Sequence, residues 1–152
     1  LVSYLIENKL KIATAESCTG GLLASRLTDI PGVSEVFEMG IVSYSNRIKN
    51  EFLGVKSEDL EKYGAVSEAV AKEMSKGAAK KADADIGVGI TGIAGPGGGT
   101  IKKPVGTVWL SFYFAKTDEN PAYLLSLSGS RAEIRNKTCD EAVKRLKNHF
   151  NI

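Results

Sequence analysis

The sequence predicts an α/β protein, a three-layer α/β/α sandwich built on a mixed and mostly parallel sheet. Helix and strand patterns alternate over the first part of the chain, as they do where helices connect parallel strands. Towards the end, two strand patterns flank a turn at Asn120-Pro121, which is typical of a hairpin and adds one antiparallel strand. No repeat, low-complexity tract or linker divides the chain, so we expect a single domain over residues 1–152.

Hydrophobic periodicity, caps and turns predict the individual elements. Helix patterns cover residues 1–9, 20–29, 46–54, a short stretch from 57, 68–82 and 130–150. Strand patterns cover residues 10–15, 35–45, 85–91, 105–115 and 122–128. Pro31-Gly32 stops the second helix, and Ser67 supplies the N-cap of the longest early one. That helix places Val70, Met74 and Ala78 on one face, as an amphipathic helix requires.

Composition limits the classes of function. The 152 residues are 43% hydrophobic and 25% charged, which is ordinary for a globular protein with one core. No apolar run approaches the roughly 18 residues that a membrane span needs, so we expect a cytoplasmic protein without a membrane partner. A formal net charge of +2 is too small to predict a nucleic-acid partner.

Two cysteines, Cys18 and Cys139, fit neither a disulfide framework nor a zinc site, because the chain has only one histidine to complete the ligands. We therefore expect reduced thiols and no bound metal. The first ten residues include Glu7, Asn8 and Lys9, so no export signal is visible there. The start on Leu1 rather than Met is expected to mark a trimmed sequence or a domain of a longer chain.

A glycine pattern near residue 90 resembles a nucleotide-binding motif but lacks its context. The segment "GVGITG" satisfies the dinucleotide fingerprint, yet it is followed by "IAGPGGGT", which predicts an extended loop rather than a helix. No Gly-Lys-Ser/Thr follows, which excludes a P-loop. A glycine-rich loop at a strand end still exposes backbone N–H groups, so Thr91 and this loop are candidates for ligand binding. The alternative is a mobile surface loop.

The histidine count removes the common catalytic arrangements. The only one, His149, lies in the last turn of the final helix, where a cation simply complements the helix dipole. A Ser-His-Asp triad and a Cys-His pair are therefore not expected. If Ser17 attacks a substrate, its base must be a lysine, a carboxylate or a tyrosine.

Lys49, in the segment "YSNRIK", is the best candidate for that base. With Asn46 as N-cap it falls at the third helical position, where the helix dipole disfavours a cation. An ordinary lysine with a pKa of ~10.4 is almost fully protonated at neutral pH, so a base at this position needs a lowered pKa. Burial and the helix N-terminus act in that direction. The alternative is a solvated lysine on a short helix.

Ser17 lies between a strand and a helix in "TAESCTGG", where a serine is most often an N-cap. Gly20 and Gly21 favour the second interpretation, a nucleophile, because glycines in a first helical turn allow a ligand to approach N–H groups closely. The N–H groups around Thr19 and Gly20 could then hold a developing oxyanion. Cys18 has no histidine partner and is expected to pack inward.

Arg131 and Arg135, four residues apart at the start of the last helix, lie on one helix face. They could form a fork for a phosphate or a carboxylate. The alternative is that they pair with Glu133 or Asp140.

Six segments together resemble the CinA C-terminal domain family, the nicotinamide mononucleotide (NMN) amidohydrolases. The segments are "AESCTGG", "YSNRIKNEFLGV", "GAVSEAVAKEM", "TGIAGPGGG", "KPVGTV" and "GSRAEIR". They occur in this order over essentially the whole chain. The resemblance implies an α/β/α fold of anticodon-binding-domain-like topology, hydrolysis of NMN to nicotinate mononucleotide and ammonia, no cofactor and no metal. It also implies a homodimer or a higher homo-oligomer.

The active residues of the family are carried onto matching positions of this sequence. The resemblance implies catalytic roles for Ser17, Tyr44, Lys49, Thr91 and Arg131. Candidate substrate contacts are Thr19, Gly20, Gly21, Asn46, Gly95, Pro96 and Gly98. Two departures, Gly97 and Ser130 where the family commonly has Asp, affect the details of substrate contact. An alternative function is a non-catalytic nucleotide-binding or assembly module of the competence/damage-inducible CinA type.

Overall fold

The computed structural model describes residues 1–152 and is built on one sheet of five strands, in the order β2-β1-β3-β4-β5. The strands are β1 (Ile12–Glu16), β2 (Phe37–Val42), β3 (Ile86–Gly92), β4 (Thr107–Phe114) and β5 (Ala122–Ser126). β1 pairs in parallel with both β2 and β3, and β4 runs antiparallel to its two neighbours. Four strands therefore share one direction and one opposes them, which confirms the predicted mixed, mostly parallel sheet.

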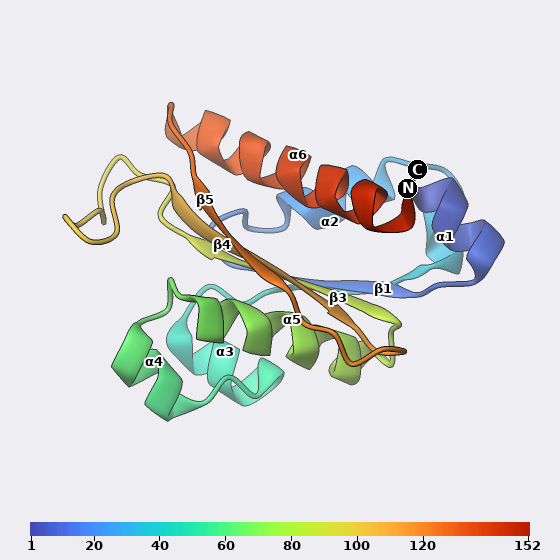
Figure 1. Cartoon of the computed structure of the whole chain (residues 1–152), viewed down its shortest axis with the longest axis horizontal. Coiled ribbons are helices and arrows are strands. Elements are labelled where there is room, and N and C mark those ends of the chain that lie inside the picture. The colour runs from blue at the N-terminus through green and yellow to red at the C-terminus, as the bar shows by residue number, and fades with distance from the viewer.

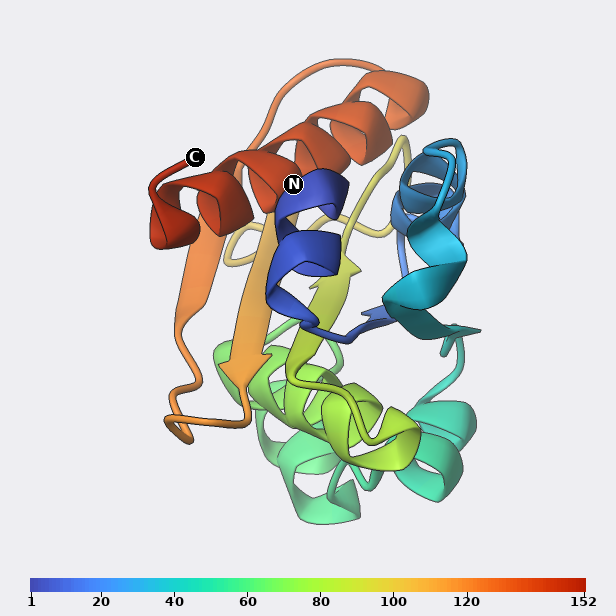
Figure 2. The same ribbon diagram turned by 90° about the vertical axis from the view of Figure 1, so that its right-hand side faces the viewer.

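Helices cover both faces of this sheet, as Figures 1 and 2 show. On one face lie α1 (Val2–Asn8), α2 (Leu22–Thr28) and α6 (Arg131–Phe150); a short 3₁₀ helix (Val33–Glu35) precedes β2. On the other lie α3 (Asn46–Leu53), α4 (Ser57–Tyr63) and α5 (Glu68–Ala82). The three-layer α/β/α sandwich is thereby confirmed. The helices lack the combination of length and hydrophobicity that a membrane span requires.

The larger hydrophobic core fills the space between the sheet and α1, α2 and α6. β4 contributes Val108, Leu110, Phe112 and Phe114 to this core, the alternate positions that the sequence pattern places on one side. α6 begins with a complete capping box, in which Ser130 Oγ accepts the N–H of Glu133 and the Glu133 carboxylate accepts the N–H of Ser130. Ser130 therefore has a structural role at the start of α6.

The opposite layer explains the glycine pattern of β3. α5 lies so close to β3 that a Cβ atom on Gly87 would approach the carbonyl oxygen of Ser75 to 1.9 Å, and one on Gly89 would approach that of Ala71 to 2.4 Å. Both distances are far inside van der Waals contact. These glycines of "GVGITG" allow a helix to pack on the sheet, and β3 continues into a loop rather than a helix, as the sequence context predicts.

The glycine-rich loop after β3 extends beyond the sheet at the end that also holds the start of α6, away from the two chain termini (Figure 1). This is the edge at which the parallel strands β2, β1 and β3 end. Ligand sites of open α/β sheets lie outside the carboxyl ends of the strands. The topology therefore directs the search for a site to this edge.

Candidate active site

A cavity of about 280 Å³ lies at the carboxyl ends of the three parallel strands. Its walls come from the end of β1, the segment after β2, the turn before α5, the glycine-rich loop and the first residue of α6. All five residues for which the resemblance implies a catalytic role line it: Ser17, Tyr44, Lys49, Thr91 and Arg131. Segments separated by more than a hundred residues in sequence thus converge on one small volume.

Lys49 projects from the first turn of α3 into this site. The N-cap of α3 is Ser45, whose Oγ accepts the N–H of Ile48 at 3.2 Å, so the prediction of Asn46 as N-cap is wrong. Lys49 is consequently the fourth helical residue rather than the third. Its side chain is only 1% exposed, which excludes a solvated lysine. Asn46 is exposed and does not line the cavity.

The amine of Lys49 has three oxygen neighbours and no carboxylate. Nζ lies 3.2 Å from Ser17 Oγ, 2.8 Å from the Ser43 carbonyl oxygen and 3.1 Å from the Tyr44 carbonyl oxygen. It takes part in no ion pair. Burial lowers the pKa of Lys49 below the ordinary lysine value, because desolvation disfavours the charged amine and outweighs the opposing electrostatic effect of Cys18.

The three neighbours define what a neutral amine would do here. Two of them, the carbonyls of Ser43 and Tyr44, can only accept hydrogen bonds. A neutral amine has two N–H groups for these carbonyls and one lone pair. The remaining neighbour is the Ser17 hydroxyl, which can donate its proton to that lone pair. The geometry therefore matches a serine nucleophile beside its base.

Ser17 is not the cap of the next helix. α2 begins at Leu22 after Gly21, and its first turn is capped by the buried carboxylate of Glu16, which accepts the N–H groups of Leu23 and Ala24 at 2.9 and 3.0 Å. This frees the Ser17 hydroxyl from the role that serines at such positions usually have. The sequence interpretation missed Glu16, although a lone acid at the end of an apolar strand and before a helix is a usable signal.

The turn from Ser17 to Gly21 separates β1 from α2. The N–H of Gly20 donates to the Ser17 carbonyl at 3.0 Å. It is therefore not free to hold an oxyanion, contrary to the prediction. Neither Thr19 nor the two glycines line the cavity. The positive φ of Gly20 and Gly21 (57° and 93°) instead permits the tight turn. Cys18 is 6% exposed and burial raises the pKa of its thiol to about 11, as expected for an inward-packed cysteine.

Arg131 bridges two walls of the site. Its guanidinium donates to the Gly95 carbonyl at 2.8 Å and to the Tyr44 hydroxyl at 3.2 Å. Arg135 does not join it in a fork, because its guanidinium contacts the turn after Ser17. The predicted fork is therefore wrong, and so is the alternative of pairing with Glu133 or Asp140: Glu133 belongs to the capping box and Asp140 pairs with Arg26.

Thr91 fixes the wall of the cavity that the turn before α5 forms. It is 1% exposed, and its hydroxyl donates to the Ala65 carbonyl at 2.8 Å, which fixes the turn before α5 against the end of β3. Of the predicted loop contacts, Gly95 and Gly98 line the cavity and Pro96 does not. Gly97 also lines it, and a Cβ atom there would meet nothing within 4 Å, so this departure enlarges the cavity without straining the backbone.

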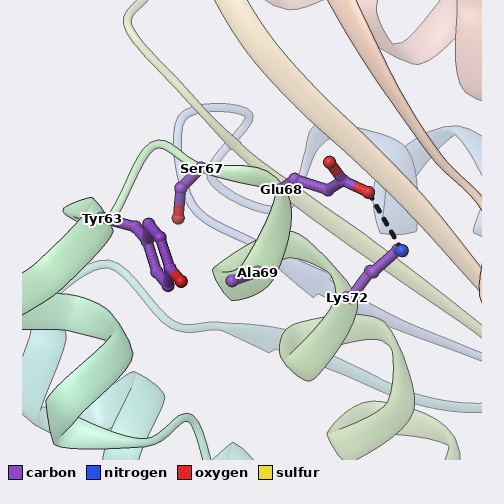
Figure 3. Close-up of a pocket in the computed structure, with 5 residues that line it drawn as sticks. All are labelled: Tyr63, Ser67, Glu68, Ala69 and Lys72. Atoms are coloured by element: carbon purple, nitrogen blue, oxygen red, sulfur yellow. Dashed lines mark ion pairs between the residues drawn. The ribbon is translucent and has the colours of Figure 1, made fainter.

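A larger cavity, of about 440 Å³, opens beside Tyr63 and the first turns of α5 (Figure 3). Glu68 and Lys72 form an ion pair of 3.0 Å at its edge, and Ser67 is occupied as the N-cap of α5. It contains no nucleophile next to a base. Size alone therefore does not identify the reactive site. No cluster of three or more His, Cys, Asp or Glu side chains that could hold a metal ion is found anywhere.

These observations define a class: an α/β/α protein whose parallel strands end at a buried serine–lysine pair. Comparison with known proteins then identifies the family. The model of the CinA C-terminal domain family matches residues 1–150, and the chain belongs to this family.

Two curated relatives illustrate the similarity. A CinA-like protein of Akkermansia muciniphila is 58% identical over 114 residues, covering 75% of this chain and 28% of the relative. A CinA-like protein of Chlorobium limicola is 50% identical over 143 residues, covering 92% of this chain and 33% of the relative. The chain thus spans about a third or less of the length of these relatives.

Two solved structures cover nearly the whole chain. The competence/damage inducible protein CihA of Agrobacterium tumefaciens superposes with a TM-score of 0.93 at 40% identity, covering 95% of this chain and 88% of that one. The competence damage-inducible protein A (ComA) of Klebsiella pneumoniae superposes with a TM-score of 0.93 at 34% identity, covering 98% and 91%. The fold described here is the fold of these CinA-type proteins.

Proposed function

We propose that this protein is an amidohydrolase that converts nicotinamide mononucleotide to nicotinate mononucleotide and ammonia by acyl transfer through Ser17. The observation that carries the proposal is the 3.2 Å contact between Ser17 Oγ and the Lys49 amine, which is buried and has a lowered pKa. The resemblance to the NMN amidohydrolases supplies the identity of the substrate. Membership of the CinA family is compatible with this activity.

The first half of the reaction forms an acyl-enzyme. Ser17 Oγ attacks the carboxamide carbon while its proton passes to the Lys49 amine, and the carbonyl π electrons move onto oxygen. The tetrahedral intermediate collapses with cleavage of the C–N bond. Lys49 returns the proton to the departing nitrogen, which leaves as ammonia, and Ser17 remains esterified to the nicotinoyl group.

The second half regenerates the enzyme. Water attacks the ester carbon as its proton passes to Lys49, and cleavage of the C–Oγ bond returns that proton to Ser17. The sum consumes one water and one carboxamide and yields one carboxylic acid and one ammonia. Lys49 acts as base and acid in turn, which requires a pKa closer to neutrality than an ordinary lysine has.

The charges around the cavity support an anionic substrate. No Asp or Glu lines the cavity, and Arg131 is its only basic residue besides Lys49, whose amine is neutral in the proposed mechanism. Arg131 is exposed and is held by neutral partners, the Gly95 carbonyl and the Tyr44 hydroxyl, which a phosphate can replace with a charge-assisted contact. We assign the ribose phosphate to Arg131, with the neighbouring glycine-rich loop beside it.

The test is ammonia release from NMN, together with detection of nicotinate mononucleotide. The parent protein should form both products in equal amounts, whereas Ser17→Ala and Lys49→Met should lower kcat by about 10³-fold or more. Ser111→Ala is the matched control, because Ser111 is a fully buried serine of β4 outside the cavity. An inactive parent that still binds NMN would contradict the proposal and favour a binding module. Active Ser17 and Lys49 variants would contradict the assigned residues.

A further inference from the structure

The guanidinium of Arg135 contacts backbone carbonyls and no carboxylate. Arg135 lies in the second turn of α6, is half-buried, and forms no ion pair. Its Nε donates to the Cys18 carbonyl at 3.1 Å and its Nη2 donates to the Thr19 carbonyl at 2.8 Å. A guanidinium fork thus holds two successive peptide groups of the turn, those that follow Cys18 and Thr19.

Holding a carbonyl also fixes the N–H group at the other end of the same peptide. A trans peptide is planar, and its C=O and N–H point in opposite directions. The only cis peptide of the chain is Gly95-Pro96, so the peptides of this turn are trans. The Cys18 carbonyl is held by Arg135, which orients the N–H of Thr19. The Ser17 carbonyl is held by the N–H of Gly20 at 3.0 Å, which orients the N–H of Cys18.

The two N–H groups oriented in this way have no hydrogen-bond acceptor among other residues. Neither the N–H of Cys18 nor that of Thr19 donates to any backbone carbonyl or to an oxygen of another side chain, and Cys18 has only its own thiol sulfur, a weak acceptor. Cys18 is 6% exposed and lines the cavity, whereas Thr19 is fully buried and does not line it, so of the two N–H groups only that of Cys18 can meet a substrate oxygen. Buried N–H groups without partners are rare, because leaving one unsatisfied is unfavourable.

We propose that the N–H group of Cys18, which borders the cavity, is the oxyanion donor of this enzyme and that Arg135 is the positioning residue that holds the turn carrying it in shape. The proposal rests on the proposed acyl transfer at Ser17. The N–H of the residue after a nucleophilic serine is a common oxyanion donor in hydrolases. Cys18 occupies that position and lines the cavity.

The chemistry assigns a separate task to each group. As the Ser17 Oγ–carbon bond forms, the negative charge develops on the former carbonyl oxygen, and the preoriented N–H group of Cys18 stabilises it without reorganisation. Arg135 itself does not touch the substrate in this scheme, because both of its contacts are to carbonyls of the turn. Removing Arg135 should destabilise the transition state more than the bound substrate. We therefore expect kcat to fall while KM changes little.

The first test compares Arg135→Met, which removes the donors but keeps an apolar stem, with Arg135→Lys, which keeps the charge without the fork. We expect Arg135→Met to lower kcat for NMN by about 10- to 100-fold with KM within about threefold, and Arg135→Lys to recover part of the loss. Arg145→Met is the matched control, because Arg145 is a similarly half-buried residue of α6 that stacks on Tyr123 away from the cavity. A kcat of Arg135→Met within twofold of the parent, or a rise in KM equal to the fall in kcat, would overturn the proposal.

The second test does not depend on the substrate being NMN. 4-Nitrophenyl acetate should acetylate Ser17 if the protein activates the Ser17 hydroxyl. Mass spectrometry locates the acetyl group. We expect acetylation of Ser17 in the parent and about tenfold slower acetylation in Arg135→Met, with Arg145→Met unchanged. Equal rates in all three proteins, or no acetylation of Ser17 in the parent, would overturn the assignment of Cys18 as the oxyanion donor. A parent that is acetylated at Ser17 but inactive on NMN would contradict only the proposed substrate.

Discussion

Two buried serine clusters lie in different parts of this molecule, and only one of them borders the candidate active site. In the first, Ser17 lies beside the Lys49 amine at the carboxyl ends of β1 and β2. In the second, Ser75 of α5 and Ser111 of β4 lie 3.0 Å apart, and both hydroxyls reach the Asn120 side-chain oxygen at 2.8–3.0 Å. Both clusters contain a buried serine hydroxyl. They differ in its partner, which is an amine in the first cluster and a side-chain amide in the second.

The difference separates a structural polar cluster from a reactive one. The second cluster is neutral, and carbonyls of Lys72 and Pro121 offer further acceptors, so its hydrogen bonds are satisfied within the folded chain. The first contains a group whose charged form is disfavoured by burial, next to a hydroxyl that faces a cavity. A hydroxyl becomes a nucleophile when its partner can accept the proton, and burial of the serine alone does not achieve this.

Replacing Lys49 by arginine is expected to have the largest effect on activity. Arginine keeps the positive charge and the hydrogen-bond donors, but it does not lose its proton in a protein. We therefore expect Lys49→Arg to lower kcat for NMN by about 10³-fold while substrate binding is retained. Steady-state kinetics and circular dichroism measure activity and fold together. A folded variant with kcat within tenfold of the parent would show that Lys49 acts as a cation or a scaffold rather than as a base.

The pH dependence of activity in the parent protein reports the ionisation of Lys49. The reaction requires the neutral amine of Lys49, so kcat/KM should rise with pH, about tenfold per unit while the amine is protonated. Burial lowers the pKa of Lys49, so this rise should level off below the pH at which an ordinary lysine titrates. Measurements above about pH 7 avoid the second ionisation of a phosphate, near 6. A continued rise to pH 10.5 would contradict a lowered pKa.

Removing a hydroxyl from the second cluster should change stability and not activity. Ser111→Ala leaves Asn120 and Pro121 oxygens without this donor, and we expect the free energy of unfolding to fall by about 1–3 kcal/mol. Urea unfolding measures this change. kcat should stay within about twofold of the parent, since the side chain makes no contact with the site. A large loss of kcat at unchanged stability would mean that the second cluster is coupled to catalysis.

Glu73 of α5 provides the smallest expected effect, on stability alone. Burial, followed by a hydrogen bond with the Asp59 carboxyl, raises the pKa of Glu73 from its ordinary value of 4.5 to about 7. A raised carboxyl pKa stabilises the fold below the unfolded value, and this contribution is lost as the pH rises through about 7. Glu73→Gln should therefore flatten the pH dependence of stability between pH 4.5 and 7, by less than about 1 kcal/mol because solvent screens the side chain. Urea unfolding at pH 5 and pH 8 measures this pH dependence. The same change in unfolding free energy between the two pH values in parent and variant would contradict a raised pKa of Glu73.

Much of the fold was predictable from the sequence, because caps and periodicity are local signals. α5 covers residues 68–82 as predicted, with Ser67 as its N-cap, and α6 ends at residue 150. The β4 alternation correctly places Val108, Leu110, Phe112 and Phe114 together in the larger core. The N-cap of α3 was misplaced by one residue because Ser45 and Asn46 are both good caps and only the backbone conformation distinguishes them.

The site was predictable in part, for a physical reason. A lysine in a first helical turn conflicts with the dipole and is visible in the sequence. The carbonyls of Ser43 and Tyr44 that orient its amine, and those of Cys18 and Thr19 that hold Arg135, carry no sequence signal, because every residue has a carbonyl. Their roles depend on tertiary geometry. The predicted arginine fork failed for the same reason.

The ionisation of Lys49 is the most direct test of the account. Carbon-13 NMR of the Lys49 Cε in protein labelled at lysine reports its titration, with Lys49→Arg identifying the signal. The account predicts a pKa clearly below the ordinary lysine value of 10.5, with a neutral amine gaining in population over the pH range in which activity rises. A Lys49 pKa at or above 10.5 would leave Ser17 without a base and contradict the proposed mechanism.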